Sequence, residues 1–394
     1  MKLFKSLLIA PATLGLLAPM SVTANELNFA EVSNYSSSEE VQSISDFNTK
    51  ELAVTNSRVD GLEARLNNFE AGTFSETTTA SFGVDFMLGA VDGGTSTADD
   101  AVNATYSFGM SLNTSFTGED SLDIAIDAGN SNGAAGVLEF GGNTSGDGLV
   151  VDGVSYTFPI GEFTAFVGDN TDGSLLFTTA SAYGGPSDTL DDYGNNFAAL
   201  GGGSGTAFGA SYDFPNSGFA AAVGVTTDGS TANGVLTKES NDAYGLNVSY
   251  TGDSFGMSLS FADIEVPVAT YVESTYIAFN GYYTPDSSGL PSFSVGFETA
   301  ENEITEGAAD VDSSAWFVGL SWDEFGPGTA GLAIGTKTHT LDQAGTEEET
   351  MYEAYYSYDI NDGMSITPLI YIKEFAADGV DDETGLMVKT SFAF

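Results

Sequence analysis

Residues 244–261 read Tyr-Gly-Leu-Asn-Val-Ser-Tyr-Thr-Gly-Asp-Ser-Phe-Gly-Met-Ser-Leu-Ser-Phe, two alternating runs joined by a short turn at 251–254. Large apolar side chains occupy every second position, and glycine, serine or asparagine stands between them. The apolar set is Tyr244, Leu246, Val248 and Tyr250, followed by Met257, Leu259 and Phe261. Because successive side chains of a strand point to opposite faces, this period predicts two antiparallel strands with one apolar face and one small, polar face.

The same alternation recurs from Thr73 to the end of the sequence. It predicts about 16 strands, near 74–89, 102–117, 121–127, 149–158, 161–168, 203–213, 217–226, 242–251, 254–262, 272–283, 291–300, 313–322, 328–338, 350–359, 363–373 and 384–394. Short turns such as 214–217 and 359–363 alternate with longer acidic connections such as 227–241 and 338–349. Aromatic residues stand beside the turns, which is typical of the interfacial girdles of membrane barrels.

These patterns predict an all-β fold, a transmembrane antiparallel β-barrel of about 16 strands over residues 73–394. A short coiled-coil helix is expected to precede it. A soluble exported β-sandwich also alternates, so it remains an alternative that detergent-dependent solubility would exclude. No internal run reaches the roughly 18–20 apolar residues that a spanning helix needs.

The charge balance restricts the function. The chain has 56 acidic and 9 basic residues, a formal net charge of −47, no cysteine and one histidine, His339. Nucleic acid is excluded as a partner because the chain offers few cations for phosphates. Disulfides, thiolate metal sites and cysteine nucleophiles are also excluded. We expect His339 to be an exposed loop residue, and we expect no enzyme and no cofactor.

The N-terminal region predicts export. Residues 1–24 have the basic start, the apolar run and the small-residue cleavage site of a signal peptide. Residues 25–48 are polar and suggest a flexible periplasmic segment. Over 49–71, apolar residues follow a heptad pattern formed by Leu52, Val59, Leu62, Leu66 and Phe69. This pattern predicts a coiled-coil helix, with a lone amphipathic helix as the alternative.

Three stretches resemble the cyanobacterial outer-membrane porins. They are Met-Lys-Leu-Phe-Lys-Ser-Leu-Leu-Ile-Ala-Pro-Ala-Thr-Leu-Gly-Leu (1–16), Arg-Val-Asp-Gly-Leu-Glu-Ala-Arg (58–65) with Phe-Ser-Glu-Thr-Thr (74–78), and the last two strands at 361–368 and 388–394. The chain departs from the family because residues 25–48 are too few for an S-layer-homology domain. The resemblance implies a homotrimer in the outer membrane with its N-terminal segment in the periplasm. The terminal aromatics Phe392 and Phe394 also fit the general signal by which the barrel-assembly machinery recognises outer-membrane barrels.

The predicted function is a passive channel for small hydrophilic solutes and ions. The connection over 169–202 corresponds in general porins to a loop that folds into the lumen and constricts it. Its acidic constriction candidates are Asp169, Asp172, Asp188, Asp191 and Asp192. Strand parity turns Lys337, Lys373, Lys389 and Glu353 inward. The lysines would either face the acidic loop in a transverse field or neutralise nearby acids.

The excess of carboxylates predicts a preference for cations. A non-conducting structural or adhesive barrel and a carbohydrate-selective porin, as some relatives are labelled, are the alternatives. Acidic runs are weak candidates for loosely bound Ca²⁺ or Mg²⁺ through oxygen ligands. These are Glu347, Glu348 and Glu349, and Asp381, Asp382 and Glu383. Solvated loop charge is the favoured interpretation of both runs.

Overall fold

The computed structural model describes residues 77–95, 101–131, 139, 143, 145–190, 198–200, 205–229, 234–265, 273–286, 289–303 and 310–394. The predicted signal peptide (1–24), flexible segment (25–48) and coiled-coil helix (49–71) lie outside these residues. Among the described residues, no helix combines the length and the apolar character needed to cross a bilayer. The account below therefore concerns the β-sheet region.

The described residues form one antiparallel sheet. Its strands are β1 (Thr78–Asp92), β2 (Asn103–Thr114), β3 (Ser121–Gly129), β4 (Val150–Ile160), β5 (Phe163–Thr171), β6 (Gly205–Asp213), β7 (Phe219–Thr227), β8 (Asp242–Thr251), β9 (Phe255–Glu265), β10 (Glu273–Tyr283), β11 (Ser292–Glu303), β12 (Val311–Phe325), β13 (Gly328–Thr336), β14 (Thr340–Leu341), β15 (Thr350–Asn361), β16 (Met364–Lys373) and β17 (Glu383–Ala393). The strand β14 has only 2 residues and pairs with the outer end of β12. The other sixteen strands of this region confirm the predicted barrel.

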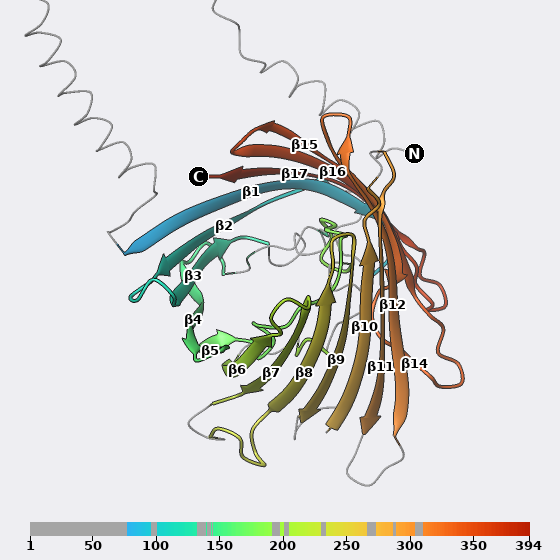
Figure 1. The fold of residues 1–394 in the computed structure, drawn as a ribbon. Coiled ribbons are helices and arrows are strands. Elements are labelled where there is room, and N and C mark those ends of the chain that lie inside the picture. Colours follow the sequence, from blue (N-terminus) through green and yellow to red (C-terminus); the bar gives the residue numbers. More distant parts are fainter. Residues whose placement is uncertain are drawn as a thin grey trace, which may run out of the picture. The chain divides into compact units, whose positions relative to one another are not determined.

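The sheet closes on itself, because β1 pairs with β2 on one side and with β17 on the other. Figure 1 shows the blue β1 beside the red β17. At this seam the backbone N–H of Phe82 donates to the carbonyl of Phe394 at 2.9 Å, and Phe394 returns the bond at 3.1 Å. A closed ring leaves no strand edge unpaired, which a sheet needs if it is to lie in lipid.

The two faces of the sheet differ as the alternation predicts. On β8 and β9 the apolar side chains of Leu246 and Leu259 are 46% and 54% exposed. Between them, Asn247 and Ser260 face the interior and are only 2% and 1% exposed. An apolar exterior around a polar interior is the reverse of a soluble protein and is the pattern of a membrane barrel.

Aromatic rings gather beside the short turns. Tyr212 lies 5.0 Å from Phe214 across the end of β6, and Tyr250 contacts both Phe219 and Phe255 at 4.9 and 5.3 Å between ring centroids. These rings belong to the turns that join β6 to β7 and β8 to β9. They form part of an aromatic girdle at the short-turn end of the barrel.

Connection lengths also follow the prediction. On the short-turn side, β4–β5, β12–β13 and β15–β16 are joined by two residues each, at 161–162, 326–327 and 362–363. On the other side the connections include 130–149, 172–204, 228–241 and 337–349. One connection departs from the rule, because 284–291 on the short side is longer than 266–272 and 304–310 on the long side. The connection between β5 and β6 is the longest.

Candidate functional site: the barrel interior

The connection between β5 and β6, residues 172–204, is called the inserted loop below, and its described residues lie along the interior wall. The structure describes it at 172–190 and 198–200. Its backbone N–H groups donate to inward side chains of successive strands: Gly173 to Thr226 Oγ1 of β7 (2.6 Å), Thr178 to Asn247 Oδ1 of β8 (3.0 Å), Ala180 to Ser258 Oγ of β9 (3.0 Å), and Ala182 and Tyr183 to Ser294 Oγ of β11 (2.9 and 3.0 Å). Small polar residues of the predicted lumen face therefore satisfy the loop backbone.

Glycines on the wall let the loop approach closely. A Cβ on Gly224 of β7 would stand 1.8 Å from the carbonyl oxygen of Gly173. One on Gly245 of β8 would stand 2.8 Å from the ring of Phe177 and 2.9 Å from Leu200. Because ordinary carbon contacts begin above 3 Å, only glycine at these positions allows the loop to lie directly on the sheet.

The tip of the loop is held by an aromatic and acidic group. The ring of Tyr183 packs 5.3 Å from Phe317 and 6.0 Å from Tyr355, and its hydroxyl donates to Glu353 Oε1. Tyr355 Oη donates to the carbonyl of Gly184 at 3.0 Å. The surrounding buried cluster is Met87, Val91, Tyr183, Leu190, Phe317, Ala333, Met351, Tyr355, Leu369, Tyr371 and Met387. Glu353 points inward as predicted, but it is 4% exposed and anchors the loop.

The acidic residues predicted on this loop have separate surroundings. Asp169, at the end of β5, is exposed and accepts from Thr206 Oγ1 at 3.1 Å, and Asp172 accepts the backbone N–H of Ser174 at 2.7 Å. Asp188 borders the interior. Partial burial and then the charge of Glu139 raise the pKa of its carboxyl, and Lys373 opposes them. Asp191 and Asp192 lie outside the described residues.

Two of the inward lysines have acidic partners. Lys373 Nζ binds Glu139 Oε1, and the backbone N–H of Thr189 in the inserted loop donates to Glu139 Oε2 at 3.1 Å. Lys337 Nζ lies 2.8 Å from Glu349 Oε2 and 3.4 Å from the centroid of the Phe375 ring. These contacts favour neutralisation of local acids over a transverse field for both lysines.

The contact with Lys337 also changes the pKa of Glu349. Burial alone would raise the pKa of Glu349, but hydrogen bonds from Lys337 and from the backbone N–H of Ala376 outweigh it and lower that pKa. Lys389 stands on the inward face of β17, directly opposite Met87 of β1 and Thr367 of β16.

Carboxylates on β1 and β3 were missed by the sequence analysis. Register places Asp85 opposite Ser107, and Asp123 and Asp127 opposite Asn113 and Gly109 of β2. All lie on the inward face, since Phe86 of β1 is 56% exposed on the outside. The signal was present, because Leu122, Ile124 and Ile126 alternate with the two aspartates of β3.

His339 contradicts the expectation of an exposed loop residue. Its side chain is 9% exposed, its Nε2 lies 2.5 Å from Glu298 Oε1, and its Nδ1 lies 2.9 Å from Ser313 Oγ. The expectation was wrong because sequence distance hides the partner, which lies on β11. A hydrogen-bonded series of Ser, His and Glu has the residue types of a hydrolase triad. Ser313, however, is 4% exposed and already accepts a hydrogen bond from Asn302 Nδ2 at 3.0 Å. A nucleophile must be open to its substrate, so this arrangement is structural.

No family model matches the chain, and no curated protein sequence matches it. Among solved structures, it is similar to an anion-selective porin from Comamonas acidovorans at 16% identity and a TM-score of 0.58, over 81% of this chain and 99% of that one. It is similar to OprB of Pseudomonas putida at 13% identity and a TM-score of 0.59, over 81% and 94%. Outer-membrane expressed OmpT of Vibrio cholerae gives 12% and 0.54, over 82% and 99%. The chain has a porin-type fold. At these identities the likeness concerns the fold, and membership of the cyanobacterial family stays a prediction.

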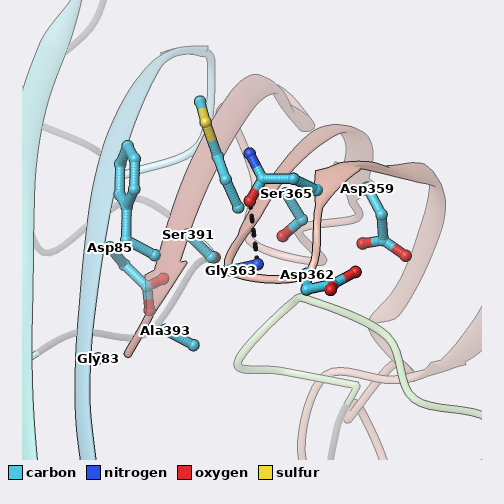
Figure 2. Close-up of a pocket in the computed structure, with 11 residues that line it drawn as sticks. Gly83, Asp85, Asp359, Asp362, Gly363, Ser365, Ser391 and Ala393 are labelled. Carbon is cyan, nitrogen blue, oxygen red and sulfur yellow. Dashed lines mark hydrogen bonds between the residues drawn. The ribbon is translucent and has the colours of Figure 1, made fainter. Parts of the chain in front are cut away.

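A hollow of about 600 Å³ opens at the short-turn end of the porin-type barrel. Figure 2 shows Asp85 of β1, Asp359 near the end of β15 and Asp362 of the β15–β16 turn around it, with Ser365 and Ser391 between them. The three carboxylates make this end of the interior acidic.

The acidic runs proposed as cation ligands do not converge. Glu347 and Glu348 are exposed, and Glu349 pairs with Lys337. Asp381 is exposed, Asp382 Oδ1 accepts the backbone N–H of Phe375 at 3.2 Å, and Glu383 Oε1 accepts from Tyr371 Oη at 2.8 Å. Within the described ranges, no group of three or more His, Cys, Asp or Glu residues could hold a metal ion.

Proposed function

We propose that this protein is an outer-membrane porin, a passive diffusion channel for small hydrophilic solutes and ions. The observation that carries the proposal is the closed ring with an apolar exterior, a polar interior and a long loop lying along one side of the interior wall. A wall of this kind separates lipid from a hydrated lumen. The likeness to porin structures supports the same function.

We further propose that the channel prefers cations. Asp85, Asp123 and Asp127 line β1 and β3, whereas Lys337 and Lys373 are paired with glutamates. Carboxylates that form no ion pair among the described residues raise the local cation concentration within roughly 8 to 10 Å at physiological ionic strength. The anion selectivity named for the Comamonas protein belongs to that protein, because selectivity depends on side chains and not on the fold.

Planar-bilayer recording of the purified protein tests both statements. In a KCl gradient we expect stepwise conductance and a reversal potential near that of potassium. The cation preference should weaken as the salt concentration increases. A reversal potential near that of chloride would refute the cation preference. Protein that stays soluble without detergent and shows no heat-dependent gel migration would refute the membrane barrel.

A non-conducting barrel is the second candidate, because two buried apolar clusters and the inserted loop occupy part of the interior. Folded protein that inserts into bilayers without passing current would support it.

The proposal includes a homotrimer with the N-terminal segment in the periplasm, as the sequence resemblance implies. Phe394 stacks on Phe82 at 5.6 Å and Phe392 meets Phe86 edge-on at 6.2 Å, both near the seam. We propose that these terminal aromatics serve barrel assembly and that the protein has no enzymatic activity. Chemical cross-linking in detergent should give a trimer, and deletion of Phe394 should lower the yield of assembled barrel.

A further inference from the structure

The returning limb of the inserted loop, residues 198–200, ends at one inward carboxylate. The backbone N–H of Ala198 donates to Glu298 Oε2 at 2.7 Å. The other oxygen, Oε1, faces His339 Nε2 at 2.5 Å. Glu298 lies on β11, in the middle of the wall, and is 0% exposed. One oxygen of Glu298 therefore binds the inserted loop, and the other binds His339 of the outer connection.

A carboxylate removed from water is stable only when donors replace the water. His339 can supply a donor from Nε2 whether the ring is neutral or charged, provided that Nδ1 has its own partner. Ser313 Oγ on β12 is that partner, at 2.9 Å, and the ring of Tyr276 on β10 holds the imidazole edge-on at 5.7 Å. The histidine is therefore oriented from two strands toward Glu298.

Apolar packing also holds this limb. Its buried cluster consists of Ala198, Leu200, Ala243, Ala262, Tyr276, Ala278 and Ala300, with Phe177 and Ile264 packed against it. Leu200 is 1% exposed and supplies most of the apolar surface that the limb buries, because alanine buries little. This packing has no preferred direction, whereas a charge-assisted hydrogen bond to a buried carboxylate is both strong and directional. The polar contact therefore adds a directional restraint to this part of the loop.

We propose that Glu298 and His339 form a positioning pair that holds the returning limb of the inserted loop against the barrel wall. Tyr183 and Glu353 hold the tip, so the pair fixes the limb on the other side of it. His339 lies in the 337–349 connection, so its contact with Glu298 links this outer connection to the interior. The effect on ion flow rests on the proposed channel function, whereas the placement of the limb does not.

The absence of cysteine makes a direct test available. Ala199, partly exposed between two buried residues, is changed to Cys in the full-length protein. The rate of its modification by a charged methanethiosulfonate reports release of the limb. With His339→Leu, which removes the donor, we expect the rate to rise about tenfold. With His339→Gln, whose amide can still donate to Glu298, we expect it to stay within about twofold of the parent.

Equal rates in the Leu and Gln variants, whether unchanged or raised together, would overturn the proposal. Heat-dependent gel migration checks that each variant forms the barrel. If His339→Leu fails to fold, Ser313→Ala replaces it. This change removes the group that orients the ring, together with an acceptor for Asn302 Nδ2, and leaves the imidazole in place. An unchanged rate would again overturn the proposal. If the parent protein shows no conductance but the variants show the expected labelling rates, the channel function is refuted and the positioning pair is still supported.

Discussion

Gly224→Ala should release the leading limb of the inserted loop from the wall. The new Cβ would stand 1.8 Å from the carbonyl oxygen of Gly173, whereas Cβ contacts below 3.0 Å are essentially never observed. Gly173 must therefore move by at least 1.2 Å (from 1.8 to 3.0 Å). Its N–H now donates to Thr226 Oγ1 at 2.6 Å, and the same displacement along that bond would break it.

The size of the effect follows from that bond. Leaving a buried donor unsatisfied costs about 1–3 kcal/mol. This shifts the equilibrium between the seated and released limb by roughly 5- to 150-fold. Proteolysis of an opened segment follows its population when reclosing is fast. Cleavage by chymotrypsin at Phe177 should therefore accelerate by the same factor, while the barrel still shows heat-dependent gel migration.

Gly109→Ala is the matched control. Gly109 also lies on the inward face of a strand, but its nearest neighbour to a new Cβ is Asp127 Oδ1 at an ordinary 3.4 Å. We expect cleavage of this variant at the rate of the parent protein. Identical cleavage of all three proteins, or equal acceleration in both variants, would show that close approach at Gly224 does not seat the loop.

Three further changes have definite expected outcomes. Asp127→Asn should reduce the cation preference measured by reversal potential, whereas the same change in an exposed turn should leave it unchanged. Lys373→Met leaves Glu139 buried without its cation and should destabilise the barrel by about 3–5 kcal/mol in urea titration, and adding Glu139→Gln should restore much of the loss. At Asp120 in the β2–β3 turn, the hydrogen bond from Tyr156 lowers the carboxyl pKa, and bonds from Thr117 and Ser115 add to it against burial. Because this pKa is lower in the folded than in the unfolded state, the ionised carboxyl stabilises the folded barrel above the unfolded pKa of about 4. This stabilisation is lost as the pH falls further, so Asp120→Asn should make the melting temperature less dependent on acid pH.

The strands were predictable because alternation is a local property. The predicted strand at 242–251 coincides with β8 (Asp242–Thr251), and the strand at 328–338 differs from β13 (Gly328–Thr336) only at its end. The brief β14 escaped prediction because two residues cannot show a period. The strand expected at 161–168 begins later, at Phe163, because a two-residue turn precedes it.

The interior contacts were harder to predict. Parity placed Lys373 and Glu353 on the inward face, but their partners come from connections far away in the sequence. Glu139 meets Lys373 across 234 residues, and no local pattern encodes that meeting. Glu298 attracted no attention as one acid among 56, and His339 was misjudged because its partner Glu298 lies 41 residues away in the sequence. Side-chain partners depend on how long connections fold back, which periodicity does not describe.

The seam between β1 and β17 has a consequence for biogenesis. The long strands from β2 to β16 pair with neighbours close in the sequence, but β1 finds its second partner only in β17, the last strand of the ring. Until that strand arrives, two unsatisfied edges remain open and invite pairing with other chains. Pairing β1 with β17 closes the longest loop of chain in the sheet and therefore has the highest entropic cost, so we expect the ring to close late in folding. A nascent chain stalled before β17 would therefore depend on an escort that shields both edges.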